Sequence, residues 1–149
     1  MEVYDENLTI KAALAQLFER FGFPADAYAA KWFAVGIGKI QVWMPNLPSR
    51  VKAVRFHDVH HVLTGYPANW KGEVEIGAWE IATGCTTFWV AWFLNLGSLM
   101  MGLVLYPRAL WKAFQRGWRT RTNLYHDFEY EPLLALTVKE LREKIGLSQ

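Results

Sequence analysis

The chain has 149 residues, of which 52% are hydrophobic and 20% charged, so it can form a hydrophobic core and does not have a disordered composition. Its net charge of +2 is too small to indicate nucleic-acid binding, and its single cysteine, Cys85, excludes an internal disulfide and a cysteine-rich zinc finger. The N-terminal residues have the pattern of neither a secretory signal nor a transit peptide, so a bacterial cytoplasmic location is expected.

Three helices are expected in the first half of the chain. The first has apolar residues at helical spacing, and the second begins after Pro24 and stops before the prolines at positions 45 and 48. Ser49 is a typical N-cap for the third helix, and Gly65 is a typical C-terminal stop. The expected ranges are 8–20, 24–43 and 49–63.

The second half of the chain predicts further helices. Pro107 is typical of a first helical turn, and Thr137 with Glu140 predicts a capping box for the last helix. The expected ranges are 72–83, 107–120 and 137–146, with an irregular loop at 121–132. With the apolar segment described next, these ranges predict an all-α fold of about six to seven helices in a single domain, residues 1–149.

The most apolar segment, residues 85–106, has 22 residues and no charge. Its length and composition would allow a transmembrane span. Asn95, Ser98 and Gly102 weaken that interpretation, although small residues also occur in membrane helices. A lone span would be unexpected in a chain that otherwise resembles a soluble protein, so a buried or membrane-dipping helix is favoured.

Four side chains around the third expected helix are candidates for one metal site. His57 and His61 are one helical turn apart, so both imidazoles leave the same face, as in helical zinc sites. Asp58 can reach the ion or orient a histidine. Turn signals between positions 65 and 72 let the chain reverse, which would bring Glu73 back toward the pair. Such a donor set suits a divalent metal, and zinc, iron, manganese and cobalt all fit.

The same residues also allow a simpler interpretation. A histidine pair on a helix is commonly a packing or surface feature, and the histidines at 60 and 126 have no assigned role. Glu80 follows Glu73 by one heptad, so it could orient a ligand or act as a base, with a solvated carboxylate as the alternative. From the residues alone, metal binding and packing stay open.

A resemblance to a known family favours the metal. The string His57-Asp58-Val59-His60-His61, followed after eleven residues by Glu73, resembles the HDxxH-x11-E motif of the Coq-four family of coenzyme Q biosynthesis proteins. Residues 62–65 and 75–80 are similar to the context of that motif, and segments 119–125, 130–134 and 141–147 are similar to the end of the family. The resemblance covers residues 45–147.

The resemblance implies an α-helical fold that binds a divalent metal, usually zinc, through His57, Asp58, His61 and Glu73. It also implies a prenyl lipid or prenylated quinone precursor in an apolar groove. Further implications are peripheral attachment to the inner face of a bacterial membrane and contact with other quinone-biosynthesis proteins. The implied function is in ubiquinone biosynthesis, where the family organises a complex and supports the replacement of the ring carboxylate at C1 by a hydroxyl.

Two segments, one apolar and one basic, are candidates for contact with such a lipid or with a membrane. A tryptophan-rich run could line the channel for a prenyl tail, through Trp89, Trp92, Phe93, Leu96 and Met100. Basic residues in the helix 107–120 follow one stripe, which could face an anionic membrane or hold a lipid phosphate; they are Arg108, Lys112, Arg116 and Arg119. A solvated face over a packed one is the alternative. An exposed tryptophan-rich face also favours a homodimer.

Three functions therefore stay open at this point. The first is a metal-dependent enzyme, such as an oxidative decarboxylase or lyase, without assigned catalytic residues. The second is a non-catalytic scaffold that binds a prenyl lipid and uses the metal structurally. The third is an integral membrane protein anchored by residues 85–106.

Overall fold

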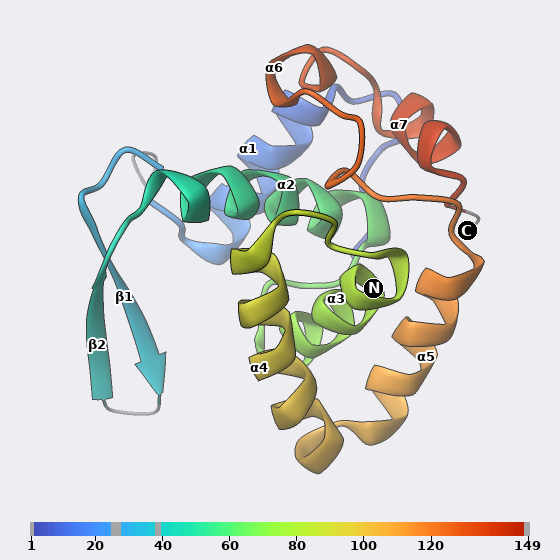
Figure 1. Cartoon of the computed structure of the whole chain (residues 1–149). Helices are drawn as coiled ribbons and strands as arrows, with labels where there is room; N and C mark the ends of the chain where they lie inside the picture. Colours follow the sequence, from blue (N-terminus) through green and yellow to red (C-terminus); the bar gives the residue numbers. More distant parts are fainter. Residues whose placement is uncertain (1, 25–27, 38–39, 148–149) are drawn as a thin grey trace.

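Helices build most of the protein, and one hairpin stands beside them (Figure 1). The computed structural model describes residues 2–24, 28–37 and 40–147. Its elements, in chain order, are α1 (Ile10–Phe21), β1 (Trp32–Ile37), β2 (Ile40–Pro45), α2 (Pro48–Thr64), α3 (Trp70–Thr83), α4 (Trp89–Leu105), α5 (Pro107–Arg119), α6 (Tyr130–Leu133) and α7 (Val138–Ile145). The expected helical fold is confirmed, with seven helices in the described residues.

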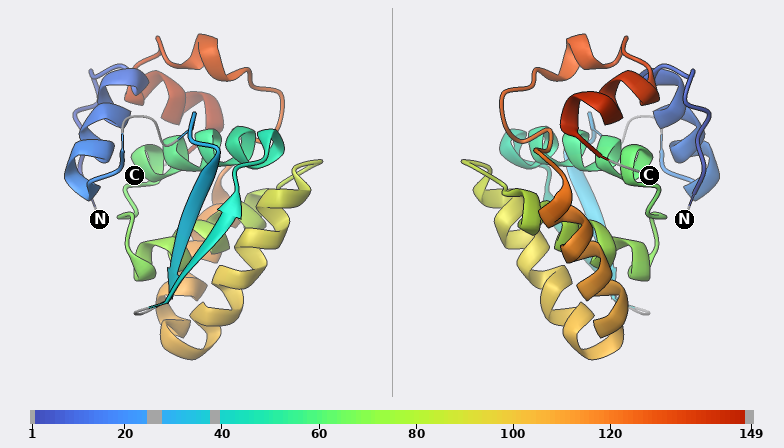
Figure 2. Two further views of the ribbon diagram at one scale, coloured as in Figure 1. Left: turned by 90° about the vertical axis from the view of Figure 1, so that its left-hand side faces the viewer. Right: turned by 90° about the vertical axis from the view of Figure 1, so that its right-hand side faces the viewer.

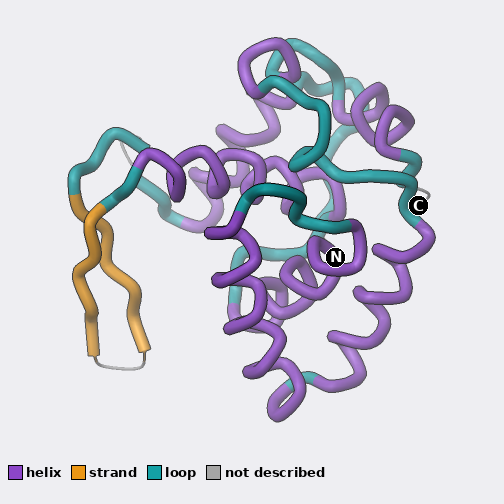
Figure 3. The backbone as a smooth tube through the Cα atoms, viewed as in Figure 1, coloured by secondary structure: helices purple, strands orange, loops and turns teal. Residues whose placement is uncertain are grey.

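The expected helix at 24–43 is wrong. The chain instead forms an antiparallel hairpin, in which Trp32 pairs with Pro45 and Ile37 with Ile40. The hairpin projects from the helical body in Figure 1 and lies in front of that body in the left view of Figure 2, and Figure 3 distinguishes its strands from the helices. Aromatic and β-branched residues dominate this segment, and its glycines disfavour a helix, so strand propensity prevails. Residues 25–27 and 38–39 of the expected helix lie outside the described residues.

Local capping signals set the ends of the first and last helices. Thr9 caps α1, which begins at Ile10, two residues after the expected start, and its hydroxyl accepts a hydrogen bond from the Ala12 amide. The capping box predicted for α7 is present, with both the Thr137 and the Glu140 hydrogen bonds formed. Backbone hydrogen bonds join these two helix starts, because the Val138 amide donates to the Leu8 carbonyl at 2.9 Å.

Helix α3 lies at the centre of the helical body, with α4 and α5 packed against it. Trp79 is completely buried, and its indole donates a hydrogen bond to the Thr120 hydroxyl at 3.2 Å. Gly117 allows α5 to approach α3 closely, because a Cβ atom there would lie 2.7 Å from the Trp79 carbonyl oxygen. This close packing fixes the helix that carries two of the carboxylates described below.

Helix α4 is apolar on both its buried and its exposed sides. It buries Val90, Ala91, Asn95 and Gly102, while Val104 is 79% exposed. None of the helices in the described part of the chain reaches the length and hydropathy that a bilayer crossing requires.

Candidate metal centre

Two helices bring the candidate ligands together. His57 and His61 lie one turn apart on α2, and that helix ends where Gly65 adopts a left-handed conformation with φ of 73°. The chain then turns back, and Glu73 occupies the first turn of α3. The reversal expected from the glycine and proline signals therefore places the carboxylate opposite the histidine pair.

A tight turn fixes the start of α3. The Asn69 side chain caps the helix by accepting a hydrogen bond from the Gly72 amide at 3.0 Å. Position 72 has no room for a larger residue, because a Cβ atom there would lie 1.7 Å from the Pro67 carbonyl oxygen. Because Gly72 directly precedes Glu73, this close approach fixes the backbone position from which the Glu73 side chain extends.

The three donor groups converge at metal-binding distances. The Nε2 atoms of His57 and His61 are 3.2 Å apart. The Glu73 carboxylate lies 3.2 Å from His57 Nε2 and 3.3 Å from His61 Nε2. Tetrahedral ligands about 2.0–2.1 Å from a zinc ion are separated from one another by about 3.3 Å. His57, His61 and Glu73 could therefore hold one metal ion with little rearrangement.

The other ring nitrogen of each histidine is held by a hydrogen-bond acceptor. His61 Nδ1 donates to the Tyr66 carbonyl oxygen at 2.8 Å, and His57 Nδ1 donates to the Glu80 carboxylate at 2.9 Å. Because the protons on Nδ1 are used in these bonds, both Nε2 atoms can present lone pairs to a cation. Carboxylates and carbonyls orient metal-binding histidines in this way.

Glu80 is a fully buried polar group of the site. Its side chain is inaccessible to solvent, and its second hydrogen bond on Oε1 comes from His60 Nδ1 at 2.7 Å. Its Oε2 atom accepts from the Asn95 amide at 2.6 Å and from the Tyr125 hydroxyl at 3.1 Å. His60 in turn accepts a hydrogen bond from the Leu124 amide at 3.0 Å. The expectation of a solvated carboxylate is therefore wrong, and the orienting role considered for Glu80 matches its contacts.

The charges of the site favour ionised carboxylates. Burial raises the pKa of Glu80, but His57 and His60 together outweigh this effect and the pKa lies well below its usual range. The pKa of Glu73 is lowered in the same way, because His61 and His57 outweigh burial. Burial lowers the pKa of His57, but the carboxylates of Glu80 and Glu73 raise it well above its usual value. A proton on His57 Nε2 therefore competes with a metal ion for the lone pair of that nitrogen.

Asp58 points to a different neighbour from the other three motif residues. Its carboxylate accepts a hydrogen bond from the Tyr28 hydroxyl at 2.5 Å, and it is not among the side chains that converge on one point. Burial raises the pKa of Asp58, although His57 offsets part of this effect. The structure thus brings together three of the four expected ligands and gives Asp58 a partner in the segment before the hairpin.

A pocket of about 470 Å³ opens beside these groups. The ligand candidates His57 and Glu73 line it, together with Asp58 and Glu80. Most of its other walls are apolar or aromatic and include Phe18, Phe23, Trp32, Ala91 and Leu94. The positively charged Arg50 also lines the pocket. This combination suits a molecule with a polar or anionic end and an apolar body.

The lipid-groove candidates on α4 lie on its outer side. Four of them are between 49% and 70% exposed and Trp92 is 37% exposed; the five are Trp89, Trp92, Phe93, Leu96 and Met100. The α4 residues that line the pocket are instead Ala91, Leu94, Asn95 and Ser98. The hydropathy of α4 did not show which side faces the pocket, because both sides are apolar.

The expected basic stripe on α5 is divided between two roles. Arg108, Lys112 and Arg119 are exposed. Arg116 instead donates a hydrogen bond to the Thr64 carbonyl at 2.7 Å and lies over the Tyr66 ring, which ties α5 to the end of α2. Trp111 and Trp118 are 58% and 75% exposed on the same helix.

Sequence reasoning gave no role to several polar partners of the site. His60, which had no assigned role, reaches the same Glu80 oxygen atom as His57. Tyr28 and Tyr125 come from segments far from the motif, and no spacing rule connects them to it. The signal that could have been used is Glu80 itself, because a carboxylate in a helix surrounded by apolar residues requires buried partners.

Comparison with known proteins found no match for this chain. No protein-family model matches the chain, and no curated protein matches it. The geometry of His57, His61 and Glu73 is therefore the direct support for a metal site, and the motif is the support for a family function.

Proposed function

We propose that the protein is a ubiquinone-biosynthesis protein that binds a divalent metal, zinc in the first instance, and a prenylated aromatic lipid. The observation that carries the proposal is the convergence of His57, His61 and Glu73, whose ligand atoms are 3.2–3.3 Å apart, while the Nδ1 atom of each histidine is already hydrogen-bonded. The neighbouring pocket and the resemblance of the motif to the Coq-four family support the choice of ligand.

The residues of the pocket fit a prenylated hydroxybenzoate. The apolar walls would hold the start of the prenyl chain, and the charge of Arg50 complements a ring carboxylate. Glu80 and the Tyr66 carbonyl would keep the two histidines oriented during binding. A bound divalent metal would supply Lewis-acid stabilisation of negative charge on the oxygen atoms of the substrate.

The proposed reaction replaces the ring carboxylate at C1 by a hydroxyl. The carboxylate leaves as carbon dioxide, one oxygen atom is added to the ring, and the ring loses two electrons. Dioxygen is the oxidant in this proposal, and with one water molecule the reaction is balanced by formation of hydrogen peroxide. Zinc has no redox chemistry, so activity with iron in its place is a meaningful comparison.

The metal is tested by the metal content of the purified wild type and of His61→Ala and Glu73→Ala. We expect about one ion per wild-type chain and loss of the ion in both variants. The matched control is His126→Ala, because His126 contacts the Thr83 carbonyl at 3.1 Å and lies outside the group. Equal metal content in all four proteins would reject the site.

The reaction is tested with zinc-loaded and iron-loaded protein and a prenylated hydroxybenzoate in the presence of dioxygen. Release of carbon dioxide and formation of the hydroxylated ring are measured together, and co-purified lipid is analysed by mass spectrometry. Activity that is lost in His61→Ala would support the enzyme. Absence of turnover with both metals, together with unchanged quinone levels in cells that carry His57→Ala, would reject it.

A non-catalytic scaffold is the second candidate, and one observation favours it. The donor groups join the end of α2 to the start of α3, so an ion would brace the two helices. In that case metal removal lowers the melting temperature strongly, but refolded metal-free protein still binds a prenyl lipid. Loss of lipid binding in a folded metal-free protein would argue against the scaffold.

We further propose that the protein attaches peripherally to the inner face of a bacterial membrane, where it would meet other quinone-biosynthesis proteins. The supporting features are exposed aromatic residues near exposed cations on α5, such as Trp111 and Trp118 with Arg108 and Lys112. Flotation with anionic vesicles tests it, and Trp118→Ser should weaken attachment while high salt releases the protein. A homodimer that covers these aromatics is the competing arrangement, and sedimentation equilibrium distinguishes the two.

A further inference from the structure

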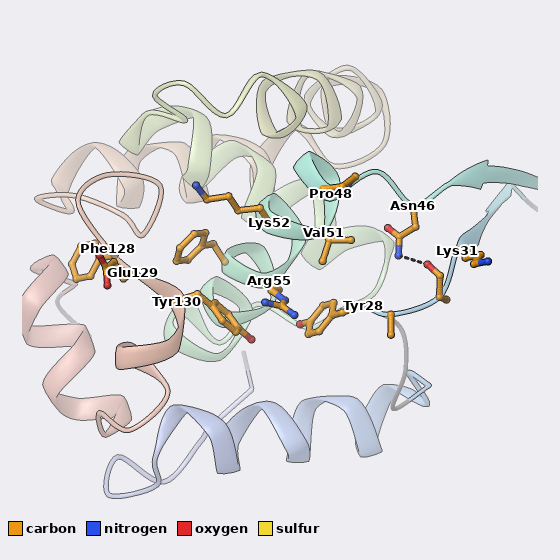
Figure 4. Close-up of a pocket in the computed structure, with 13 residues that line it drawn as sticks. Tyr28, Lys31, Asn46, Pro48, Val51, Lys52, Arg55, Phe128, Glu129 and Tyr130 are labelled. Carbon is orange, nitrogen blue, oxygen red and sulfur yellow. Dashed lines mark hydrogen bonds between the residues drawn. The ribbon is translucent and has the colours of Figure 1, made fainter.

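A second pocket, drawn in Figure 4, adjoins the metal pocket, and Tyr28 lines both. It has a volume of about 610 Å³ and lies between the start of α2, the segment before β1 and the segment before α6. None of the candidate metal ligands lines it. It is therefore a separate site, and nothing in the proposed metal chemistry uses it.

Arg55 occupies the middle of this pocket (Figure 4). Its guanidinium carbon lies 5.4 Å from the centre of the Tyr28 ring and 5.2 Å from the centre of the Tyr130 ring. Both distances are within the range of cation–π attraction, so the two rings position the guanidinium from opposite sides. A long, flexible side chain is thereby held in place before any ligand arrives.

The hydrogen-bonding capacity of Arg55 is almost unused. An arginine side chain carries five N–H donors, but within the described part of the chain the only polar partner of the guanidinium is Glu131, in an ion pair at 3.6 Å. The Nε atom of Arg55 is buried and has no acceptor among the residues that the structure describes. Buried donors in native proteins nearly always have partners. The Arg55 side chain is 38% exposed, so water can reach its other donors, and the buried Nε atom is the one that indicates an acceptor from a ligand.

The rest of the lining favours a negatively charged ligand. Lys31 and Lys52 add two positive charges, and Glu129 is the one carboxylate in the described lining. Phe56 and Val51 supply apolar surface beside Arg55. A positive field attracts anions, and the planar guanidinium matches the two oxygen atoms of a carboxylate or phosphate.

We propose that this pocket binds an oxyanion, either a carboxylate or a phosphate, with Arg55 as the residue that holds it. The occupant accepts hydrogen bonds from the guanidinium, beside the rings of Tyr28 and Tyr130. The apolar walls suit an anion that carries an aromatic or aliphatic body. The site works without the metal, so its test is independent of the proposed function.

Benzoate and inorganic phosphate are the two probes, and each is titrated separately by isothermal calorimetry into metal-free and zinc-loaded protein. We expect at least one probe to bind equally to both forms. In Arg55→Gln its affinity should fall about ten- to hundredfold, because a charge-assisted, two-bond contact is lost. The tighter probe shows whether the natural ligand is a carboxylate or a phosphate.

Two further variants keep the test decisive. Arg108→Gln removes an exposed arginine from α5 outside the pocket and should bind like the wild type. Arg55→Lys keeps the charge but not the planar fork, so it should bind with intermediate affinity and shows the effect even if Arg55→Gln folds poorly. The proposal is overturned if neither probe binds, or if folded Arg55→Gln binds like the wild type. It is also overturned if binding requires the metal, which would place the anion at the metal centre.

Discussion

Replacement of Glu80 by glutamine tests the metal centre most directly. The carboxylate is fully buried and accepts four hydrogen bonds, two of them from His57 and His60 at 2.9 and 2.7 Å. An amide of the same shape has one oxygen and one NH₂ group, so it must place a donor against donors. The variant therefore loses both the negative charge and the orientation of His57.

The expected loss follows from the position of Glu80 behind a metal-binding nitrogen. Removal of such a partner typically lowers metal affinity about 10- to 100-fold, which corresponds to about 1.4–2.7 kcal/mol at 25 °C. Because unpaired donors are also left in the core, metal-free Glu80→Gln should be about 1–3 kcal/mol less stable than the metal-free wild type.

The assay is competition for zinc with a chromophoric chelator, combined with urea unfolding of the metal-free protein. Glu75→Gln is the matched control, because Glu75 lies on the same helix and pairs with Lys71 at 3.5 Å, outside the metal group. If folded Glu80→Gln retained wild-type zinc affinity, Glu80 would have no role in holding His57, and the reasoning would be refuted.

Three further predictions concern packing, pH and ligand identity. Gly117→Ala should destabilise the protein by about 1–3 kcal/mol in urea unfolding, because its Cβ would press on the Trp79 carbonyl; an unchanged midpoint would contradict the close packing. The pKa values of Glu73 and Glu80 in the metal-free fold lie below their ordinary value of 4.5. The stabilisation that this shift gives is complete when the pH is above 4.5, and it is lost as the pH falls below that value. The melting temperature should therefore fall more steeply between about pH 5 and 3 in the wild type than in Glu73→Gln, and parallel curves would refute the pKa shift. Asp58→Asn should keep its metal content, and a protein isolated without metal would show that Asp58 is a ligand after all.

The features predicted well from the sequence are those fixed by neighbours a few residues apart. The histidine pair, the turn at Gly65 and the capping box at Thr137 each depend on local spacing, and the structure contains all three. The convergence of Glu73 on the pair also follows from local signals, since only one short turn separates the two helices.

The features that sequence reasoning missed depend on contacts between distant segments or on competing propensities. The segment 24–43 predicts a helix because apolar residues in a short run fit both periods, whereas its β-branched residues and Gly36 favour the strands that form. The burial of Glu80 depends on Asn95 and Tyr125, which lie 15 and 45 residues away along the chain. The outward orientation of Met100 reflects how α4 packs, because its composition does not distinguish one side from the other.

The chain of contacts behind the metal site ends at a backbone amide. Glu80 receives hydrogen bonds from both His57 and His60, and His60 accepts a hydrogen bond from the Leu124 amide at 3.0 Å. A change of charge at His57 is therefore transmitted through two buried side chains to a proton that NMR resolves individually. The Leu124 amide is a built-in reporter of metal occupancy, and its chemical shift and hydrogen-exchange rate should change on metal binding although no ligand atom touches it.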